Sequence, residues 1–194
     1  NISQMNKNII IAGVGGQGIL TIAAIIDLAA MNKGLHVKQA EVHGMSQRGG
    51  AVESHLRISD TVIYSDLVPK GKADLILSIE PMESLRYLPF LAKNGYIVTA
   101  LEAYKNISNY PDEERLLKEI KKTPNHVFVD ATAIAKEVGN LKTFNIVMLG
   151  AAAQYIGIEI DELENAIQMY FSAKGTDVID MNIKAFRMGF GKNK

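Results

Sequence analysis

The hydrophobic pattern at the start of the chain predicts a strand, a glycine-rich turn, a helix and a second strand. A short β-branched run at 8–12 ends at Gly13 and is typical of a buried strand. Residues 19–31 are apolar around most of a helix's circumference, which indicates a deeply buried helix, and Gly34 can close that helix in a left-handed cap. Residues 36–42 then predict the second strand. This order is the opening of a parallel α/β sheet.

The pattern changes after the second strand. Residues 43–50 (HGMSQRGG) are polar and contain glycines, and they predict a loop. Residues 51–58 alternate as a strand does, and 61–64 follow Ser59 and Asp60, which suit a tight turn. These two segments therefore predict a β-hairpin, and the sheet is expected to be mixed rather than wholly parallel.

The rest of the chain predicts more strands and then helices. A further buried strand is expected at 74–79, and two more strands are expected at 96–100 and 126–130. Pro81 suits the first turn of a helix, and a further helix is expected from Pro111 to Lys122, with acids first and bases last as the helix dipole favours.

Helices dominate beyond Thr143. They are predicted at 145–155, 161–171 and 176–190. Asp161 is a candidate cap for the second of them, with Glu164 completing a capping box. The expected fold is a three-layer, Rossmann-like α/β domain spanning 1–194, with a largely parallel sheet, a β-hairpin and a helical carboxyl end.

Composition narrows the classes of function. Lysine plus arginine and aspartate plus glutamate are 21 each, and this balance argues against a broad nucleic-acid surface. The chain has no cysteine, so it has no thiol nucleophile and no thiolate ligands for an iron–sulfur cluster. Its apolar stretches are too short to span a bilayer, and the expected location is the cytoplasm.

The first turn contains candidate ligand-binding residues, Gly13, Gly15, Gly16, Gln17 and Gly18, which satisfy G-x-G-x-x-G between a strand and a helix. Such a loop lets backbone N–H groups approach an anion at a helix N-terminus.

Three interpretations of this loop remain open. With Glu41 as a ribose-binding acid after the second strand, it fits an NAD- or FAD-binding protein. The glycines can equally serve only a tight turn and close packing, or the loop can face another ligand. A P-loop is excluded, because Ile19 and Leu20 stand where lysine and serine or threonine are needed.

The loop after the second strand is the other candidate. If the first two strands are neighbours in a parallel sheet, both loops leave the same edge. His43, Ser46 and Arg48 can then face the crevice beside the first loop, although most loop arginines are solvated and most lone histidines are structural. The spacing of His43 and His55 gives no credible metal site, and no G-x-S-x-G elbow is present. The candidate residues of this loop are His43, Ser46, Gln47, Arg48, Gly49 and Gly50.

Taken together, the two loops resemble the gamma-type domain of the 2-oxoacid:ferredoxin oxidoreductase family. GVGGQG follows the first strand, HGMSQRGG the second, and VESHLRIS comes next. The wording of the second loop is similar to that of the indolepyruvate branch. The similarity continues through ADLILSIEPMESLRYLPFL and KGTDVIDMNIKAFRMGF, and thus covers nearly the whole chain.

The resemblance implies a division of labour between subunits. A large alpha subunit is expected to bind thiamine diphosphate with Mg and the 4Fe-4S clusters, to use coenzyme A as co-substrate and to pass electrons to ferredoxin. The small chain binds none of these cofactors alone and helps enclose the active site in a hetero-oligomer. On this hypothesis both loops form the face presented to the large subunit, and Arg48 contacts an anion. The rivals are a free-standing NAD(P)- or FAD-dependent oxidoreductase and a purely structural interaction module.

Overall fold

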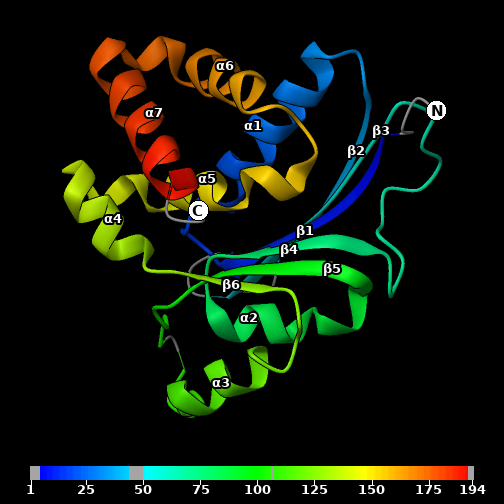
Figure 1. Ribbon diagram of the computed structural model, residues 1–194, viewed down its shortest axis with the longest axis vertical. Helices are drawn as coiled ribbons and strands as arrows, with labels where there is room; N and C mark the ends of the chain where they lie inside the picture. The colour runs from blue at the N-terminus through cyan, green and yellow to red at the C-terminus, as the bar shows by residue number, and fades with distance from the viewer. Residues whose placement is uncertain (1–4, 44–49, 106, 192–194) are drawn as a thin grey trace.

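The computed structural model describes residues 5–43, 50–105 and 107–191, and a six-stranded sheet lies at its centre (Figure 1). The strands, in spatial order, are β2 (His36–His43), β3 (Ala51–Ser59), β1 (Asn6–Val14), β4 (Ala73–Ser78), β5 (Leu91–Ala100) and β6 (His126–Val129). β1, β4, β5 and β6 are parallel, whereas β3 is antiparallel to both of its neighbours. The expected mixed, largely parallel sheet is confirmed.

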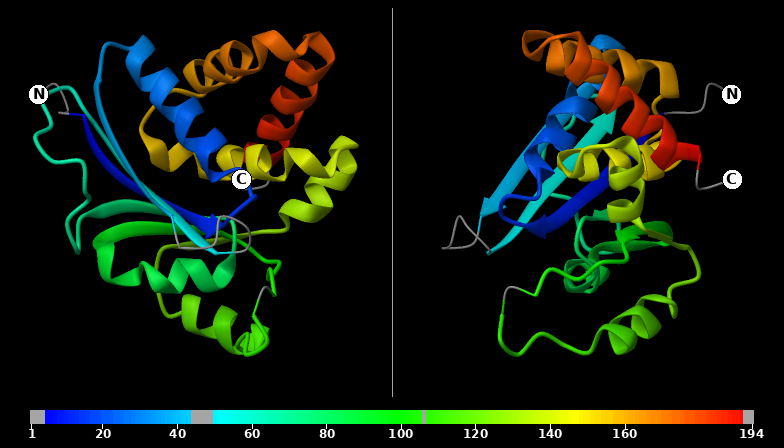
Figure 2. Two further views of the ribbon diagram at one scale, coloured as in Figure 1. Left: turned by 180° about the vertical axis from the view of Figure 1, so that it is seen from behind. Right: turned by 90° about the vertical axis from the view of Figure 1, so that its left-hand side faces the viewer.

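Helices cover both faces of the sheet and give the three expected layers (Figures 1 and 2). One face carries α1 (Ile19–Asn32), α4 (Ala131–Val138), α5 (Phe144–Ile156), α6 (Ile160–Phe171) and α7 (Thr176–Gly191). The other carries α2 (Pro81–Arg86) and α3 (Glu113–Ile120). Among the described residues, no helix is long and apolar enough to cross a membrane.

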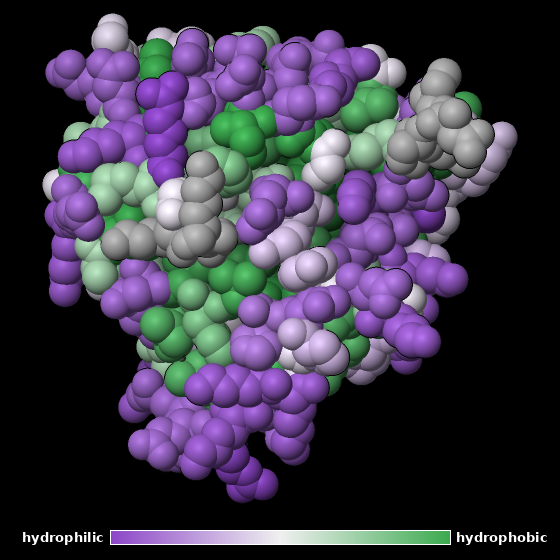
Figure 3. Space-filling view, viewed as in Figure 1, coloured by the Kyte–Doolittle hydropathy of each residue, from purple (hydrophilic) through white to green (hydrophobic). Residues whose placement is uncertain are grey.

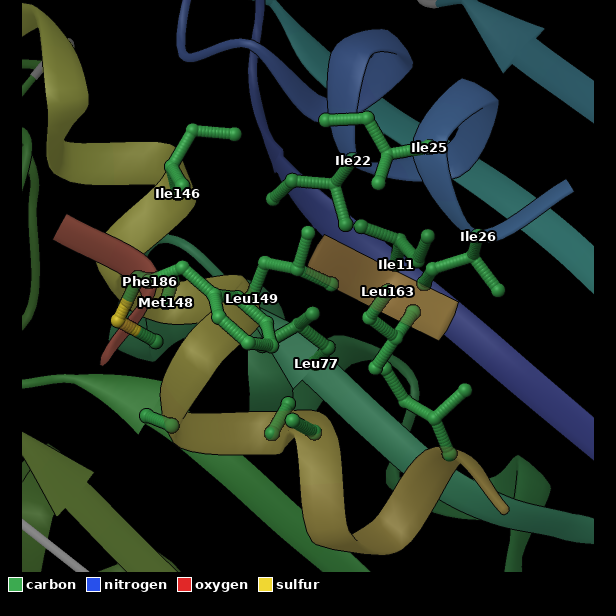
Figure 4. Close-up of a cluster of buried hydrophobic side chains, with 14 of the residues drawn as sticks. Ile11, Ile22, Ile25, Ile26, Leu77, Ile146, Met148, Leu149, Leu163 and Phe186 are labelled. Atoms are coloured by element: carbon green, nitrogen blue, oxygen red, sulfur yellow. The ribbon is translucent and has the colours of Figure 1, made fainter. Parts of the chain in front are cut away.

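Alternation along the strands divides the core into two parts. In β1, Ile9 and Ile11 face the larger helical layer, whereas Ile10 and Ala12 face α2 and α3. This alternation follows from the strand period of two, because successive side chains point to opposite faces. The larger core brings together side chains of α1, α5, α6 and α7 above the sheet (Figure 4).

α5 is the central helix of the larger layer, and ten of its thirteen residues are buried. It meets α7 at two glycines. A Cβ atom on Gly150 would overlap the carbonyl oxygen of Phe186, and one on Gly189 would overlap that of Val147. The two helices therefore touch backbone to backbone, which larger side chains would prevent.

The predicted hairpin of 51–58 and 61–64 is wrong. β3 pairs with β2 on one side and β1 on the other, so it has no free edge for another strand. The antiparallel hairpin is formed instead by β2 and β3. Residues 61–64 are not a strand, and Tyr64 is 93% exposed. Further along this connection, Val68 joins the smaller core, and its N–H donates to His55 Nδ1 at 3.1 Å.

Most other elements agree with the pattern. Gly34 takes a left-handed conformation after α1, and Pro81 stands in the first turn of α2. One expectation fails, because Glu159 rather than Asp161 stands at the N-cap position of α6. In addition, α4, between the last strand and Thr143, was not predicted.

Candidate functional site

The two glycine-bearing loops meet at the end of the sheet where the parallel strands have their carboxyl ends, which is called the carboxyl edge below. Val14 at the end of β1 pairs with Ala51 at the start of β3, and His43 at the end of β2 pairs with Val52. The Gly15 N–H donates to the Gly50 carbonyl oxygen at 2.9 Å and joins the two loops directly. Both loops therefore leave the same end of the sheet, as expected, although β1 and β2 are not neighbours as supposed, because β3 lies between them.

Gln17 closes the first loop upon itself. Its side-chain oxygen accepts from the Val14 N–H at 2.7 Å, while its own N–H donates to the Val14 carbonyl oxygen at 3.1 Å. The amide oxygen of Gln17 is therefore engaged inside the loop.

Gly18 is fixed by a residue far away in the sequence. It takes a left-handed conformation with φ of 79° at the start of α1. The buried side chain of Asn145, in the first turn of α5, donates from Nδ2 to the Gly18 carbonyl oxygen at 3.2 Å. A Cβ atom on Gly18 would overlap that Nδ2 atom. No motif in the sequence pointed to Asn145, which is 127 positions from Gly18.

The same turn keeps donors available for an anion. The N–H groups of Gly16 and Gly18 have no hydrogen-bond acceptor among the described residues. They lie at the amino end of α1, where the helix dipole favours negative charge. The loop can therefore bind a phosphate or carboxylate oxygen through its backbone.

Three carboxylates, those of Glu80, Glu102 and Asp130, lie at the same end of the sheet, just after β4, β5 and β6 respectively. Glu80 follows β4, is fully buried and accepts from the Glu83 N–H at 3.0 Å. Burial raises the pKa of Glu80 above its ordinary value, although the hydrogen bonds it accepts act in the opposite direction. No motif in the sequence pointed to Glu80.

Glu102 and Asp130 form a second acidic feature at the amino end of α4. Glu102 Oε1 accepts from the Thr132 N–H at 3.2 Å, and Asp130 Oδ1 accepts from the Ala133 N–H at 2.9 Å. Burial, together with the neighbouring Asp130, raises the pKa of Glu102. Both residues thus tie strand ends to α4. Among the described residues, no three histidine, aspartate or glutamate side chains gather to hold a metal ion.

The position of Glu41 differs from that of a ribose-binding acid. Because β3 separates β2 from β1, Glu41 lies about 10 Å from β1, two strand spacings away. Its carboxylate accepts from Gln39 Nε2 at 2.8 Å and lies near Asp27 of α1. The dinucleotide fingerprint needs the acid on the strand next to the glycine turn. This geometry disfavours that interpretation.

Part of the predicted site falls outside the described residues. Ser46, Gln47, Arg48 and Gly49 lie in the segment 44–49, and of His43 only the backbone is described. Gly50 is placed by its bond to Gly15.

Several exposed apolar side chains lie at this end of the sheet, although Val62, Tyr64 and Leu67, between β3 and β4, are exposed as well. The former belong to segments that begin or end at this edge: Leu20 in α1, Leu101 and Tyr104 after β5, and Leu141 before α5, with exposed fractions of 36–55%. Figure 3 shows apolar surface gathered at this end of the sheet, between the larger helical layer and α3. A concentration of exposed apolar groups is typical of an interface.

Comparison with known proteins gives consistent matches. The family model described as pyruvate ferredoxin/flavodoxin oxidoreductase matches residues 8–192. Indolepyruvate oxidoreductase subunit IorB of Archaeoglobus fulgidus is 39% identical, over 97% of this chain and 96% of that protein.

Two solved structures share the fold. One is a keto/oxoacid ferredoxin oxidoreductase gamma subunit from Geobacter sulfurreducens PCA, with a TM-score of 0.70 and 24% identity over 96% of this chain and 98% of that one. The other is the 2-oxoglutarate:ferredoxin oxidoreductase of Magnetococcus marinus with 2-oxoglutarate, coenzyme A and succinyl-CoA bound, with a TM-score of 0.76 and 22% identity. It is matched over 97% of this chain, which spans only 31% of that longer chain. Over nearly its whole length the chain is similar to IorB, which is a subunit of an oxidoreductase. The chain belongs to the pyruvate ferredoxin/flavodoxin oxidoreductase family.

Proposed function

We propose that this chain is the small, cofactor-free subunit of a ferredoxin oxidoreductase acting on indolepyruvate or a related aryl pyruvate. The identity of 39% with a protein named as an indolepyruvate oxidoreductase subunit supports this substrate class. We also propose that residues 1–194 act as one gamma-type domain, since the family match runs from residue 8 to 192.

The observation that carries the proposal is the edge where the Gly15 N–H meets the Gly50 carbonyl oxygen. The two glycine-bearing loops leave the sheet there, and the exposed apolar side chains of Leu20, Leu101, Tyr104 and Leu141 lie on segments at the same end. In a parallel α/β sheet this is the edge where ligands bind. We assign it as the face that docks onto a large partner subunit and helps to enclose that subunit's active site.

The division of cofactors follows from the donor atoms of this chain. Without cysteine it has no thiolates to hold an iron–sulfur cluster, so the clusters belong to the partner. Thiamine diphosphate with Mg is assigned to the partner as well, because this chain lacks the G-D-G…N-N type of motif. When bound there, thiamine diphosphate supplies the chemistry of oxidative decarboxylation. The acyl group goes to coenzyme A and the electrons go to ferredoxin.

The length of one solved relative fits such a partnership. In the Magnetococcus marinus oxidoreductase, the part matched by this chain makes up 31% of a longer chain. A domain of this fold can therefore work beside other domains of one polypeptide. That structure also contains coenzyme A, which supports coenzyme A as co-substrate here.

The small chain contributes shape and charge to this active site. Docking of its apolar rim would exclude water from the partner's reaction centre, which strengthens electrostatic interactions inside it. The N–H groups of Gly16 and Gly18, which have no acceptor among the described residues, and the guanidinium of Arg48 are donors for a carboxylate or a phosphate of coenzyme A.

Substitution of Arg48 in the assembled enzyme tests this proposal. Arg48→Ala is expected to lower kcat/KM with indolepyruvate by roughly tenfold or more, because a charge-assisted contact is lost. Arg115→Ala, at an exposed position on α3, is the matched control and should leave the rate unchanged. The rates are measured by ferredoxin reduction. Unaltered activity of Arg48→Ala, with a normal melting temperature, would contradict the role given to this loop.

A further inference from the structure

Glu80 lies beside the glycine loop although it is distant from it in sequence. The Ile79 N–H donates to the Ala12 carbonyl oxygen at 2.9 Å, which joins the end of β4 to that of β1. A Cβ atom on Gly13 would lie 3.3 Å from Cβ of Ile79. The next residue, Glu80, is fully buried. Its carboxyl group is therefore held at the base of the edge that carries both loops.

This carboxyl group gathers donors from two separate segments. Oε2 accepts from the Glu83 N–H of α2 at 3.0 Å. Oε1 accepts from the Tyr104 N–H at 3.4 Å and from the Tyr110 hydroxyl. Both tyrosines belong to the loop between β5 and α3. Glu80 thus ties this loop to the end of β4.

The partners of Glu80 are neutral groups. Glu83 is a nearby charged side chain that raises the pKa of Glu80, and the carboxylate of Glu83 is itself paired with Arg86 at 2.8 Å; among the described residues, no ion pair links Glu80 to a cation. A buried carboxyl group without a cationic partner is costly unless its oxygens accept hydrogen bonds. Simple packing would be served better by an apolar residue, so the acceptor capacity of Glu80 is the property that the fold uses.

The loop held by Glu80 carries exposed apolar side chains. Leu101, Tyr104 and Ile107 are 36%, 49% and 44% exposed. In the middle of the loop, Lys105 pairs with Glu113, the first residue of α3, at 2.6 Å. A tethered segment with apolar side chains facing water is preorganised for contact with another protein, because little conformational entropy remains to be lost on binding.

We propose that Glu80 is a positioning residue that fixes the loop between β5 and α3 as part of the surface that receives the large subunit. The inference deepens the proposed function and rests on it. The occupant is the large subunit, because the loop is continuous with the edge assigned to that partner. Glu80 does not touch the substrate; it acts through Tyr104 and Tyr110.

The test is titration of a fixed amount of large subunit with the small chain, with ferredoxin reduction as the readout. Tyr110→Phe removes one hydroxyl from Glu80 and should raise the half-saturating concentration about tenfold, while kcat at saturation stays unchanged. Tyr155→Phe is the matched control. It removes a half-buried tyrosine hydroxyl at the opposite edge of the sheet and should match the unaltered chain.

Two further variants separate positioning from simple loss of stability. Glu80→Ala should weaken association more than Tyr110→Phe, and Glu80→Gln, which keeps an acceptor oxygen, should restore part of the loss. Hydrogen–deuterium exchange provides a second readout. Peptides from 101–110 should exchange faster in Tyr110→Phe, and in the unaltered chain they should become protected when the large subunit binds.

Each result has one meaning. If the unaltered chain neither binds nor activates the large subunit, the proposed function itself is wrong. If it does both, but Tyr110→Phe behaves like Tyr155→Phe, the positioning role of Glu80 is wrong. Absence of protection at 101–110 in an active complex would also overturn it.

Discussion

Asp27, on α1, shows how one residue's surroundings set its chemistry. Its Oδ1 atom is buried without a hydrogen-bond partner among the described residues. Burial first, and the nearby Glu41 second, raise its pKa from 3.8 to about 7. Asp27 therefore changes charge near neutral pH, and the ionised form is the one that the fold disfavours.

The raised pKa of Asp27 makes the free energy of unfolding depend on pH. A folded-state pKa above the unfolded one gives stability that is present below pH 4 and lost as pH rises through 7. Asp27→Asn cannot ionise and should be more stable than the original chain at pH 8.5, by roughly 1–3 kcal/mol after allowance for partial exposure. At pH 4 the difference should vanish. Urea denaturation at both pH values measures it.

A control separates this effect from the mere loss of a negative charge. Asp180→Asn removes an exposed aspartate on α7 and should shift stability by less than about 0.5 kcal/mol at either pH. Equal effects of the two substitutions at pH 8.5 would show that the site of Asp27 is not special.

The sequence predicted the structural role of a residue well where that role depends on its neighbours along the chain. Gly34 and Pro81 stand where the helix-end rules put them. Asn145 could not be found in this way, because its partner Gly18 is 127 positions distant. Glu80 escaped for the same reason, since Tyr104 and Tyr110 come from another loop.

At the scale of helices and strands, the close contact of α5 with α7 depends on small residues. Gly150→Ala would place a methyl group on the carbonyl oxygen of Phe186. The helices would have to separate, and the expected loss of stability is about 3 kcal/mol or more, beyond the usual gain of alanine in a helix. Thermal unfolding followed by circular dichroism measures it.

Gly191 is the matched control for this pair, because it ends α7 with open space around its Cα atom. Gly191→Ala should be neutral or slightly stabilising. If Gly150→Ala melted at the same temperature as the original chain, the backbone contact between these helices would be wrong.

Periodicity located most elements but not their pairing. The segment 61–64 has a strand-like composition, yet both edges of β3 are occupied by β2 and β1. α4 was missed although Ala131, Ile134, Ala135 and Val138 have helical spacing after a capping Asp130. The signal was present in eight residues and was too short to stand out between a strand and a longer helix.

For the whole molecule, the decisive feature is the insertion of β3 between β1 and β2. The sequence predicted a common edge for both loops, and that edge exists. It did not predict the order of strands, because pairing partners are chosen by contacts distant along the chain. The insertion moves Glu41 away from the glycine turn and leaves that turn without an adjacent ribose-binding acid.

A second consequence concerns nucleotides. Because Glu41 lies two strands from β1, the isolated chain is expected not to bind NAD or FAD at micromolar concentration. Isothermal titration calorimetry with both dinucleotides measures this directly. Micromolar binding that is lost on Glu41→Ala would favour a dinucleotide-binding enzyme instead.

The most direct test of the account is to map which edge of the sheet meets the large subunit. Because the chain has no cysteine, a single one can be labelled with a photo-cross-linker before assembly. Leu20→Cys places the label at the carboxyl edge, beside the glycine loop, and Asn94→Cys places it at the opposite edge. We expect cross-links to the large subunit from position 20 and none from position 94. Cross-links from position 94 alone would contradict it.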